Sequence, residues 1–280
     1  MPSLAIIGAG RAGSALAIAA HDAGYRVAAV ASRRGEMAAR LADTVGARAV
    51  ASPPAAVVLA DLTLLAVPDG AIPTVAASIA ASGVSLHGRG VVHLGARFGP
   101  EIIGSLRATG AQVGVLHPLQ ALAGPDSASL LEGSFFRIDA TGLLEERLLA
   151  LVAALGASRL EIDPAAAPLY HAAAVLAGNA PLALLAEATR LLEAAGVQPE
   201  AAHAALAALL EGAAHNARRA GPAAALTGPV ARGDRDAIAA HLDALAAHPE
   251  ARDLYLTLTQ AMESLLATPA VAGDADSEVA

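Results

Sequence analysis

Six residues near the start of the chain have a spacing typical of phosphate binding. The segment GAGRAG at 8–13 matches the pattern G-x-G-x-x-G, and it joins a short apolar run to an Ala-rich stretch. Gly8 permits a tight turn, Gly10 lets a pyrophosphate approach the backbone, and Gly13 lets the following helix pack against the strand. The first helical N–H groups then face the anion. The pattern predicts a dinucleotide-binding turn; a tight turn without a ligand is the alternative interpretation.

The end of the second apolar run decides between NAD and NADP. An Asp or Glu at this place binds the ribose hydroxyls of NAD. This chain instead has Ser32, Arg33 and Arg34, beginning 19 positions after Gly13. Guanidinium groups form planar, charge-assisted hydrogen bonds to phosphate oxygens, so the segment suits a 2′-phosphate. We therefore expect NADP as the cofactor, unless the two arginines only solvate a loop.

Two further apolar runs end in segments that belong near the same cofactor. Val67-Pro68-Asp69 follows one run and His93-Leu94-Gly95 follows another. Ligands of open parallel sheets bind at the carboxyl ends of the strands. Asp69 is equally suited to cap the next helix. The residues predicted to bind the cofactor are Gly8, Gly10, Arg11, Ala12, Gly13, Ser32, Arg33, Arg34, Val67, Pro68 and His93.

The candidate substrate side begins at His117, which follows the sixth apolar run, and continues in YHAAAVLAGN at 170–179. Polar side chains in such an apolar segment need partners. His171 and Asn179 share a broad helix face, but they stand about 12 Å apart along the helix axis. Pro181 predicts a bend near Asn179. A bend beside a buried amide is a plausible place for ligand contact, although each histidine alone also fits a structural role.

A second polar cluster is LTGPVARGD at 226–234. Thr227 can cap, two glycines permit unusual backbone angles, and Asp234 suits the N-cap of a helix over 235–247. A capped loop between helices explains everything except Arg232. The guanidinium of Arg232 offers a bidentate site for a substrate carboxylate.

The composition excludes several chemistries. All 18 basic residues are Arg, and the chain has neither Lys nor Cys. A Schiff-base lysine, a thiol nucleophile, a disulfide and a cysteine metal site are therefore impossible. The histidines show no metal-ligand spacing, so no metal is expected. A net charge of −8 and only 2% aromatic residues disfavour nucleic-acid binding.

The elements that must position these residues follow from the apolar pattern. Short apolar runs alternate with helix-length segments, which predicts a doubly wound parallel Rossmann sheet. The runs lie at 4–8, 26–31, 47–51, 62–67, 90–94, 112–116, 135–140 and 158–162. After 163 the apolar residues have helical spacing, which predicts an all-α C-terminal domain of about four helices. We expect a Rossmann domain at 1–162, a helical domain at 163–267 and a flexible tail at 268–280.

The mean hydropathy of +0.53 raises the question of a membrane span. The stretch 164–186 has no formal charge, but it contains three Pro, a Tyr, a His and an Asn. It is predicted to be a buried helix rather than a span. No charged segment precedes the first apolar run, so a secretory signal is not expected. A soluble, cytoplasmic protein without nucleic-acid or membrane partners is the prediction.

These motifs together resemble a family in which a Rossmann-like NADP domain precedes an uncharacterised helical domain. The family is related to pyrroline-5-carboxylate reductases and deazaflavin-dependent NADP oxidoreductases, and some members resemble alternative ketopantoate reductases. The resemblance extends to about residue 265. It rests on the segments at 8–13, 93–96 (HLGA), 117–120 (HPLQ), 170–179 and 226–234. It implies a reductase of pyridine-nucleotide type, with a homodimer formed through the helical domain.

The wider group also contains enzymes that use a helical Lys as proton donor, which this chain lacks. His171 occupies a comparable place, and a histidine suits proton donation to a carbonyl. We expect an NADPH-dependent reductase of a small 2-oxo acid similar to ketopantoate. Its expected catalytic residues are His171, Asn179 and His117, and its expected substrate-binding residues are Arg232, Thr227 and Tyr170. Two alternatives stay open: an imine reductase whose substrate arrives protonated, and a non-catalytic NADP-binding sensor.

Overall fold

The computed structural model describes residues 1–267, and the predicted tail at 268–280 lies outside them. The chain forms two compact units, Met1–Asn179 and Ala180–Ala280. Each unit is described by itself below. The division lies after the predicted domain boundary at 162/163, because the helix that follows this boundary packs on the sheet domain through the buried residues Ala167 and Tyr170.

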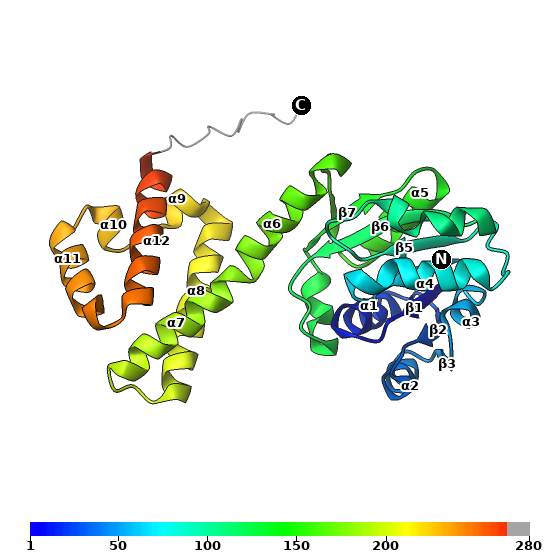
Figure 1. The fold of residues 1–280 in the computed structure, drawn as a ribbon, viewed down its shortest axis with the longest axis horizontal. Coiled ribbons are helices and arrows are strands. Elements are labelled where there is room, and N and C mark those ends of the chain that lie inside the picture. The colour runs from blue at the N-terminus through cyan, green and yellow to red at the C-terminus, as the bar shows by residue number, and fades with distance from the viewer. Residues whose placement is uncertain (268–280) are drawn as a thin grey trace, which may run out of the picture. The chain divides into compact units, whose positions relative to one another are not determined.

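The first unit is built on one eight-stranded sheet with the order β3-β2-β1-β4-β5-β6-β7-β8 (Figure 1). Its strands are β1 (Leu4–Ile7), β2 (Val27–Ala31), β3 (Arg48–Val50), β4 (Leu62–Leu65), β5 (Gly90–His93), β6 (Gln112–Leu119), β7 (Phe135–Asp139) and β8 (Ser158–Leu160). The eight apolar runs of the sequence therefore all form strands, which confirms the Rossmann prediction. The sheet is parallel except that β7 pairs antiparallel with β6.

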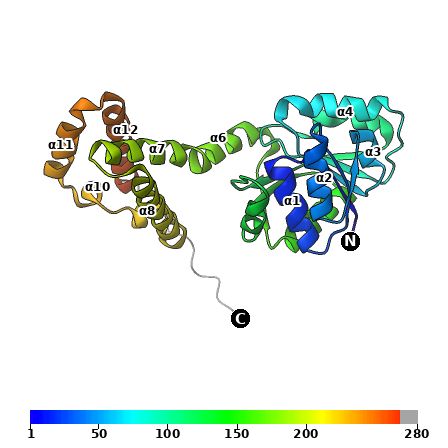
Figure 2. The same ribbon diagram turned by 90° about the horizontal axis from the view of Figure 1, so that it is seen from below.

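Helices cover both faces of this sheet (Figure 2). On one face, the buried apolar residues come from α1 (Arg11–Asp22), α2 (Gly35–Thr44) and α5 (Leu143–Ala154). On the other face, they come from α3 (Pro53–Val57), α4 (Ile72–Ala81) and the 3-10 segment η2 (Pro100–Thr109). Shorter 3-10 segments are η1 (Asp69–Ala71), η3 (Pro125–Leu131) and η4 (Pro164–Ala166). A sheet buried on both faces explains why its strands are continuous apolar runs.

The first unit ends with α6 (Ala167–Gly178), and α7 (Ala180–Ala194) begins the second. Asn179 lies between them with a φ of −106°. The interruption falls where Pro181 predicts it, since a proline ring disturbs the helix one turn before it.

The second unit contains α7, α8 (Pro199–Ala220), α9 (Pro222–Ala225), α10 (Pro229–Arg232), α11 (Arg235–Ala244), η5 (Leu245–Ala247) and α12 (Pro249–Ala267). The prediction of an all-helical region is confirmed, and within 180–267 there is no strand. The count of about four helices was too low, because the loop around 226–234 contains short helical turns. Asp234 caps α11 as predicted: its Oδ1 accepts a hydrogen bond from the N–H of Ala237 at 3.1 Å.

The prediction that 164–186 is a buried helix is wrong. The helical stretch Pro164–Ala194 is long and apolar enough to cross a membrane by length and composition. Its 18-residue apolar window has a mean hydropathy of 1.4, but only 6% of that window is buried. Leu169, Leu176 and Leu182 are 73%, 70% and 58% exposed. An apolar composition does not distinguish a core helix from one whose apolar side chains face outward. The soluble, cytoplasmic location stays a prediction.

Candidate functional site

The glycine turn joins β1 to α1, and each of its three glycines has a distinct role. Gly8 has a φ of +112°, and a Cβ there would lie 2.1 Å from the carbonyl oxygen of Ala66. A Cβ on Gly13 would lie 1.9 Å from the carbonyl oxygen of Gly8. Neither position can carry a side chain. Gly10 has nothing within 4 Å of its would-be Cβ, so open space faces the backbone there. This is the arrangement that a pyrophosphate needs.

The start of α1 is also suited to an anion. Gly10 is its N-cap residue, no side chain caps the helix, and its first turn holds no acidic residue. The first N–H groups of the helix, including those of Arg11 and Ala12, are therefore free to donate to an anion, which the positive end of the helix dipole also attracts. Arg11 itself is exposed.

The predicted arginine pair lies on the strand next to this turn. The N–H of Gly8 donates to the carbonyl oxygen of Ala31 at 2.8 Å, which ties the turn to the end of β2. Ser32 follows and is half-buried, while Arg33 and Arg34 are exposed. Neither arginine side chain makes an ion pair or a hydrogen bond with another residue in the described part of the chain. Both guanidinium groups remain available for a phosphate.

The direction of the strand order reverses between β1 and β4. In folds of this kind, the two halves of a dinucleotide bind on the two sides of that reversal. Ala66 connects the two strands, because its N–H donates to the carbonyl oxygen of Ile7 at 2.8 Å. Val67 is half-buried and Pro68 exposed at this edge. Both lie where the sequence places them, beside the glycine turn.

His93 has a different role from the one predicted. Its side chain is 0% exposed. Its Nδ1 accepts a hydrogen bond from the N–H of Gly95 at 3.1 Å, and its Nε2 lies 3.0 Å from the carbonyl oxygen of Gly99. These bonds require the neutral tautomer with the proton on Nε2, and burial lowers the pKa of the ring. His93 therefore shapes the 95–99 loop, which corrects its predicted contact with the cofactor.

Arg137 is a central residue that the sequence interpretation missed. It lies in β7 and is 1% exposed. Its Nη1 donates to the carbonyl oxygens of Ala96 and Phe98 at 2.8 and 3.1 Å, and its Nη2 donates to Asp139 at 3.2 Å. Arg137 thus holds the same loop as His93. A charged residue inside the apolar run FFRIDA was the available signal.

His117 faces Arg137 across the antiparallel strand pair, since the two residues are direct partners in the β6–β7 register. Opposite residues of such a pair project from the same face of the sheet. The Nδ1 of His117 lies 2.8 Å from the Oη of Tyr170, although 53 positions separate the two residues. The two rings meet edge to face at 87°. The structure therefore joins one predicted catalytic residue to one predicted substrate-binding residue.

The surroundings keep both members of this pair neutral at pH 7. Burial, and after it the charges of His171 and Arg137, lower the pKa of His117 to about 4. Burial raises the pKa of Tyr170 to about 12, with Arg137 opposing the rise. The pair therefore consists of an imidazole and a phenol rather than an imidazolium and a phenolate.

His171 and Asn179 are less closely connected to this pair. His171 is half-buried, and its buried Nδ1 has no hydrogen-bond partner among residues 1–267. It lies near enough to His117 to influence its pKa. Asn179 is exposed at the end of α6. Across the described residues, no group of three or more His, Cys, Asp or Glu side chains could hold a metal ion.

Thr227 and Arg232 belong to the second unit. Both are exposed, and Nη2 of Arg232 lies 4.0 Å from Oδ2 of Asp234. Gly228 and Gly233 have φ values of +91° and +66°, as the prediction of unusual backbone angles requires. The side chain of Arg232 is 65% exposed, and among residues 1–267 its only ion pair is this long one, so it can still bind an anion.

Two family models match the chain, one after the other. A Rossmann-like domain matches residues 2–118, and a domain of unknown function (DUF2520) matches residues 134–262. No protein of curated function matches the chain.

Solved structures resemble this chain over nearly its whole length. A protein described as an NADP oxidoreductase, from Bacteroides fragilis, has 24% identity and a TM-score of 0.75, with 94% of this chain and 98% of that chain covered. The reductive aminase from Aspergillus terreus has 23% identity and a TM-score of 0.64, with 95% and 94% covered; its structure contains NADPH. A pyrroline-5-carboxylate reductase from Coxiella burnetii has 15% identity and a TM-score of 0.58, with 95% and 97% covered. The chain thus matches a Rossmann-like domain over residues 2–118, followed by a match to the domain of unknown function DUF2520 over residues 134–262.

Proposed function

We propose that the protein is an NADPH-dependent reductase of a small substrate with a C=N or C=O bond. The observation that carries this proposal is the shared edge of the sheet. Open space at Gly10, an uncapped helix N-terminus and two unpaired arginines lie on its β1–β2 side. The neutral His117–Tyr170 pair lies beyond the reversal of strand order, at the end of β6. A dinucleotide site beside a proton-donating pair is what a reductase requires.

The residues fit NADPH. The backbone from Gly10 to Ala12 would hold the pyrophosphate, and Arg33 and Arg34, with Ser32, would hold the 2′-phosphate. When bound, NADPH supplies two electrons and one hydrogen as a hydride. The protein's own task is then to orient the substrate, exclude water and deliver one proton.

The neighbouring structures favour an imine over a 2-oxo acid. Two of the three named above are a reductive aminase and a pyrroline-5-carboxylate reductase, and none of the three is a ketopantoate reductase. We therefore give the imine first place and keep the ketopantoate-like acid as the second candidate. In either case Asn179 and His171 are proposed to orient the reacting group. Arg232 and Thr227 of the helical unit are proposed, separately, as binders of a carboxylate.

A substrate panel tests the proposal and separates its alternatives. The full-length protein would be given NADPH with pyrroline-5-carboxylate, other cyclic imines, ketopantoate and other 2-oxo acids in turn. Turnover of imines alone supports the first candidate, and turnover of 2-oxo acids alone supports the second. Tight NADPH binding without turnover across the panel would favour a non-catalytic sensor and contradict the reductase.

We also propose that a second copy of the chain covers the helical unit. A stable unit buries a core of large apolar side chains. Within 180–267 the buried residues are Ala202, Val230, Leu245, Ala251 and Thr259. Meanwhile Leu182 and Leu209, on α7 and α8, are 58% and 68% exposed. A unit with so little of its own core requires a partner surface.

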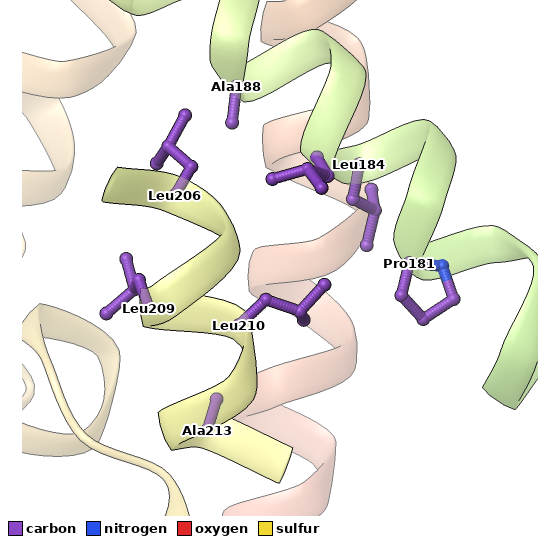
Figure 3. Close-up of a pocket in the computed structure, with 8 residues that line it drawn as sticks. Pro181, Leu184, Ala188, Leu206, Leu209, Leu210 and Ala213 are labelled. Carbon is purple, nitrogen blue, oxygen red and sulfur yellow. The ribbon is translucent and has the colours of Figure 1, made fainter. Parts of the chain in front are cut away.

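The uncovered surface includes a groove between α7 and α8, with a volume of about 220 Å³ (Figure 3). Side chains from both helices line it: Pro181, Leu184, Leu185, Ala188, Leu206, Leu209, Leu210 and Ala213. Every copy of the chain carries the same groove. A two-fold pairing would therefore cover both grooves at once, as in most homodimers.

A membrane fits this surface less well. The first turn of α6 packs on the sheet domain through the hydrogen bond of Tyr170 to His117. Outside that contact, the uncharged part of the stretch is reduced to residues 172–186. As a helix, this segment is about 22 Å long. A hydrocarbon core is about 30 Å thick. The charged Glu187 and Arg190 follow at once.

A further inference from the structure

We infer that Tyr170 is the proton donor of the reaction and that His117 resupplies its proton from solvent. This inference rests on the proposed reductase function and deepens it. It reverses the expectation from the sequence, in which His171 or His117 donates the proton. Three observations carry it: the hydrogen bond of the pair, its protonation state and the fixed charge of Arg137.

The hydrogen bond gives Tyr170 the geometry of an acid. The Oη of Tyr170 is 2.8 Å from Nδ1 of His117. In the tautomer with the proton on Nδ1, the imidazole donates to Oη and leaves the phenolic O–H directed elsewhere. The Nε2 of His117 makes no hydrogen bond to another residue of 1–267. The phenolic O–H of Tyr170 can thus face a substrate, while Nε2 of His117 reaches water.

The protonation states of the pair exclude His117 as the group that protonates the substrate directly. With a pKa of about 4, His117 is a neutral imidazole near pH 7 and cannot act as an imidazolium acid. Tyr170, with a pKa of about 12, keeps its proton in the same range. The alkoxide or deprotonated amine formed as the double bond is reduced is a stronger base than a phenolate, so transfer from Tyr170 is favourable.

The step balances without any further reagent. Bound NADPH would supply the hydride for the new C–H bond and would leave as NADP⁺, while the π electrons of the substrate would move to its nitrogen or oxygen. That atom takes the phenolic proton of Tyr170. The phenolate then receives the Nδ1 proton of His117, while Nε2 of His117 takes a proton from water and leaves hydroxide in the solvent. Exchange of the ring protons with water restores the tautomer that carries the proton on Nδ1.

Arg137 stabilises the phenolate intermediate in this cycle. Its guanidinium is opposite His117 in the strand register and is fixed by two loop carbonyls and Asp139. A buried cation in a fixed position favours a nearby anion. The titratable and charged groups that act on His117 are His171 of α6, Arg137 of β7, Asp69 of η1 and His93 of β5.

The chain contains a matched control. His241 and Tyr255 form a second pair with the same Nδ1 to Oη distance of 2.8 Å and an interplanar angle of 89°, but it is exposed and belongs to the helical unit. The experiment compares Tyr170→Phe and His117→Gln with Tyr255→Phe and His241→Gln. Turnover with the best substrate of the panel, NADPH affinity, KM and thermal midpoint are measured for each variant over a range of pH.

Tyr170→Phe is expected to lower kcat about 100-fold or more, while NADPH affinity and the thermal midpoint stay near those of Tyr255→Phe. His117→Gln is expected to lower kcat at least about tenfold and to alter its pH profile. A kcat for Tyr170→Phe within about twofold of the control would overturn this inference and leave the reductase standing. A wild type that turns over nothing in the panel would overturn both.

A spectroscopic titration of the protein without cofactor provides an independent readout. The chain has three Tyr and no Trp, so phenolate absorption reports few groups. We expect Tyr170 to titrate near pH 12, and this step should be missing in Tyr170→Phe and shifted in His117→Gln but retained in Tyr255→Phe. Burial also raises the pKa of Tyr25, so Tyr25→Phe is measured beside them and should keep the step of Tyr170. A step near pH 12 that keeps its full amplitude in Tyr170→Phe would contradict the environment on which the inference depends.

Discussion

The backbone of Gly13 packs so closely on Gly8 that a Cβ on Gly13 would lie 1.9 Å from the carbonyl oxygen of Gly8. Gly13→Ala should therefore destabilise the sheet domain by a few kcal/mol, about 1–3, since the clash is with backbone that cannot rotate away. Thermal unfolding would measure the loss. Gly212→Ala in α8 is the control, because nothing lies within 4 Å of a Cβ there.

Gly10→Ala should have the opposite effect to Gly13→Ala: it should weaken cofactor binding and leave stability unchanged. The open space at Gly10 lets a methyl group fit without strain, so the thermal midpoint should stay close to that of the wild type. The methyl group would occupy the space that the pyrophosphate needs, so the Kd for NADPH should rise at least about tenfold. Fluorescence titration of NADPH measures it. Unchanged affinity would mean that the cofactor does not approach this turn.

The preference for NADPH over NADH should depend on Arg33. Arg33 is exposed, and its side chain makes no ion pair or hydrogen bond with residues 1–267. Arg33→Ala should weaken NADPH binding about 10- to 100-fold, the effect of losing hydrogen bonds to a charged group, with little change in NADH binding or stability. Arg40→Ala, on the exposed surface of α2, is the matched control. Equal loss for both cofactors would contradict a 2′-phosphate contact.

Acidification should destabilise the sheet domain through His117. A histidine titrates near 6.5 in the unfolded chain, and the folded pKa of His117 is about 4. Between these values the unfolded chain binds more protons, so the free energy of unfolding falls as pH decreases from 6.5 toward 4. The expected loss approaches roughly 3 kcal/mol.

Urea unfolding at a series of pH values measures this dependence. His117→Gln should have a shallower slope than the wild type, although His93, whose pKa burial also lowers, contributes in the same direction. Parallel curves for His117→Gln and the wild type would show that His117 is not held neutral by folding.

The helical unit should pair two copies of the chain. Leu209→Glu places a charge in the groove between α7 and α8, so it should shift the protein from dimer to monomer in light scattering. Leu130→Glu, at a 48% exposed leucine of the sheet domain, should leave the dimer intact. A wild type that is monomeric at micromolar concentration, or that partitions into lipid vesicles, would rule out the pairing.

The strands and the glycine turn were predictable because their signals are local. A buried parallel strand requires a continuous apolar run, and the turn after β1 requires glycine where Gly8 and Gly13 meet neighbouring backbone. The direction of β7 was not predictable, since an apolar run is the same in both directions. The role of Arg137 follows from that direction, which sets it opposite His117.

The sequence alone also did not predict the contact between His117 and Tyr170. The two residues were each singled out by type, but 53 positions separate them and no local pattern pairs them. The exposure of the helix at 164–186 was missed for another reason: an apolar helix has the same composition whether its own domain or a second chain covers it.

Transfer of a labelled hydride tests the central claim most directly. The wild-type protein would be incubated with NADPH deuterated at C4 of the nicotinamide and with each imine and 2-oxo acid of the panel, and products would be examined by mass spectrometry. The account predicts one product that carries a single deuterium on the carbon of the reduced bond, formed in equal amount to NADP⁺. NADPH that binds tightly but remains unoxidised with every substrate would contradict it.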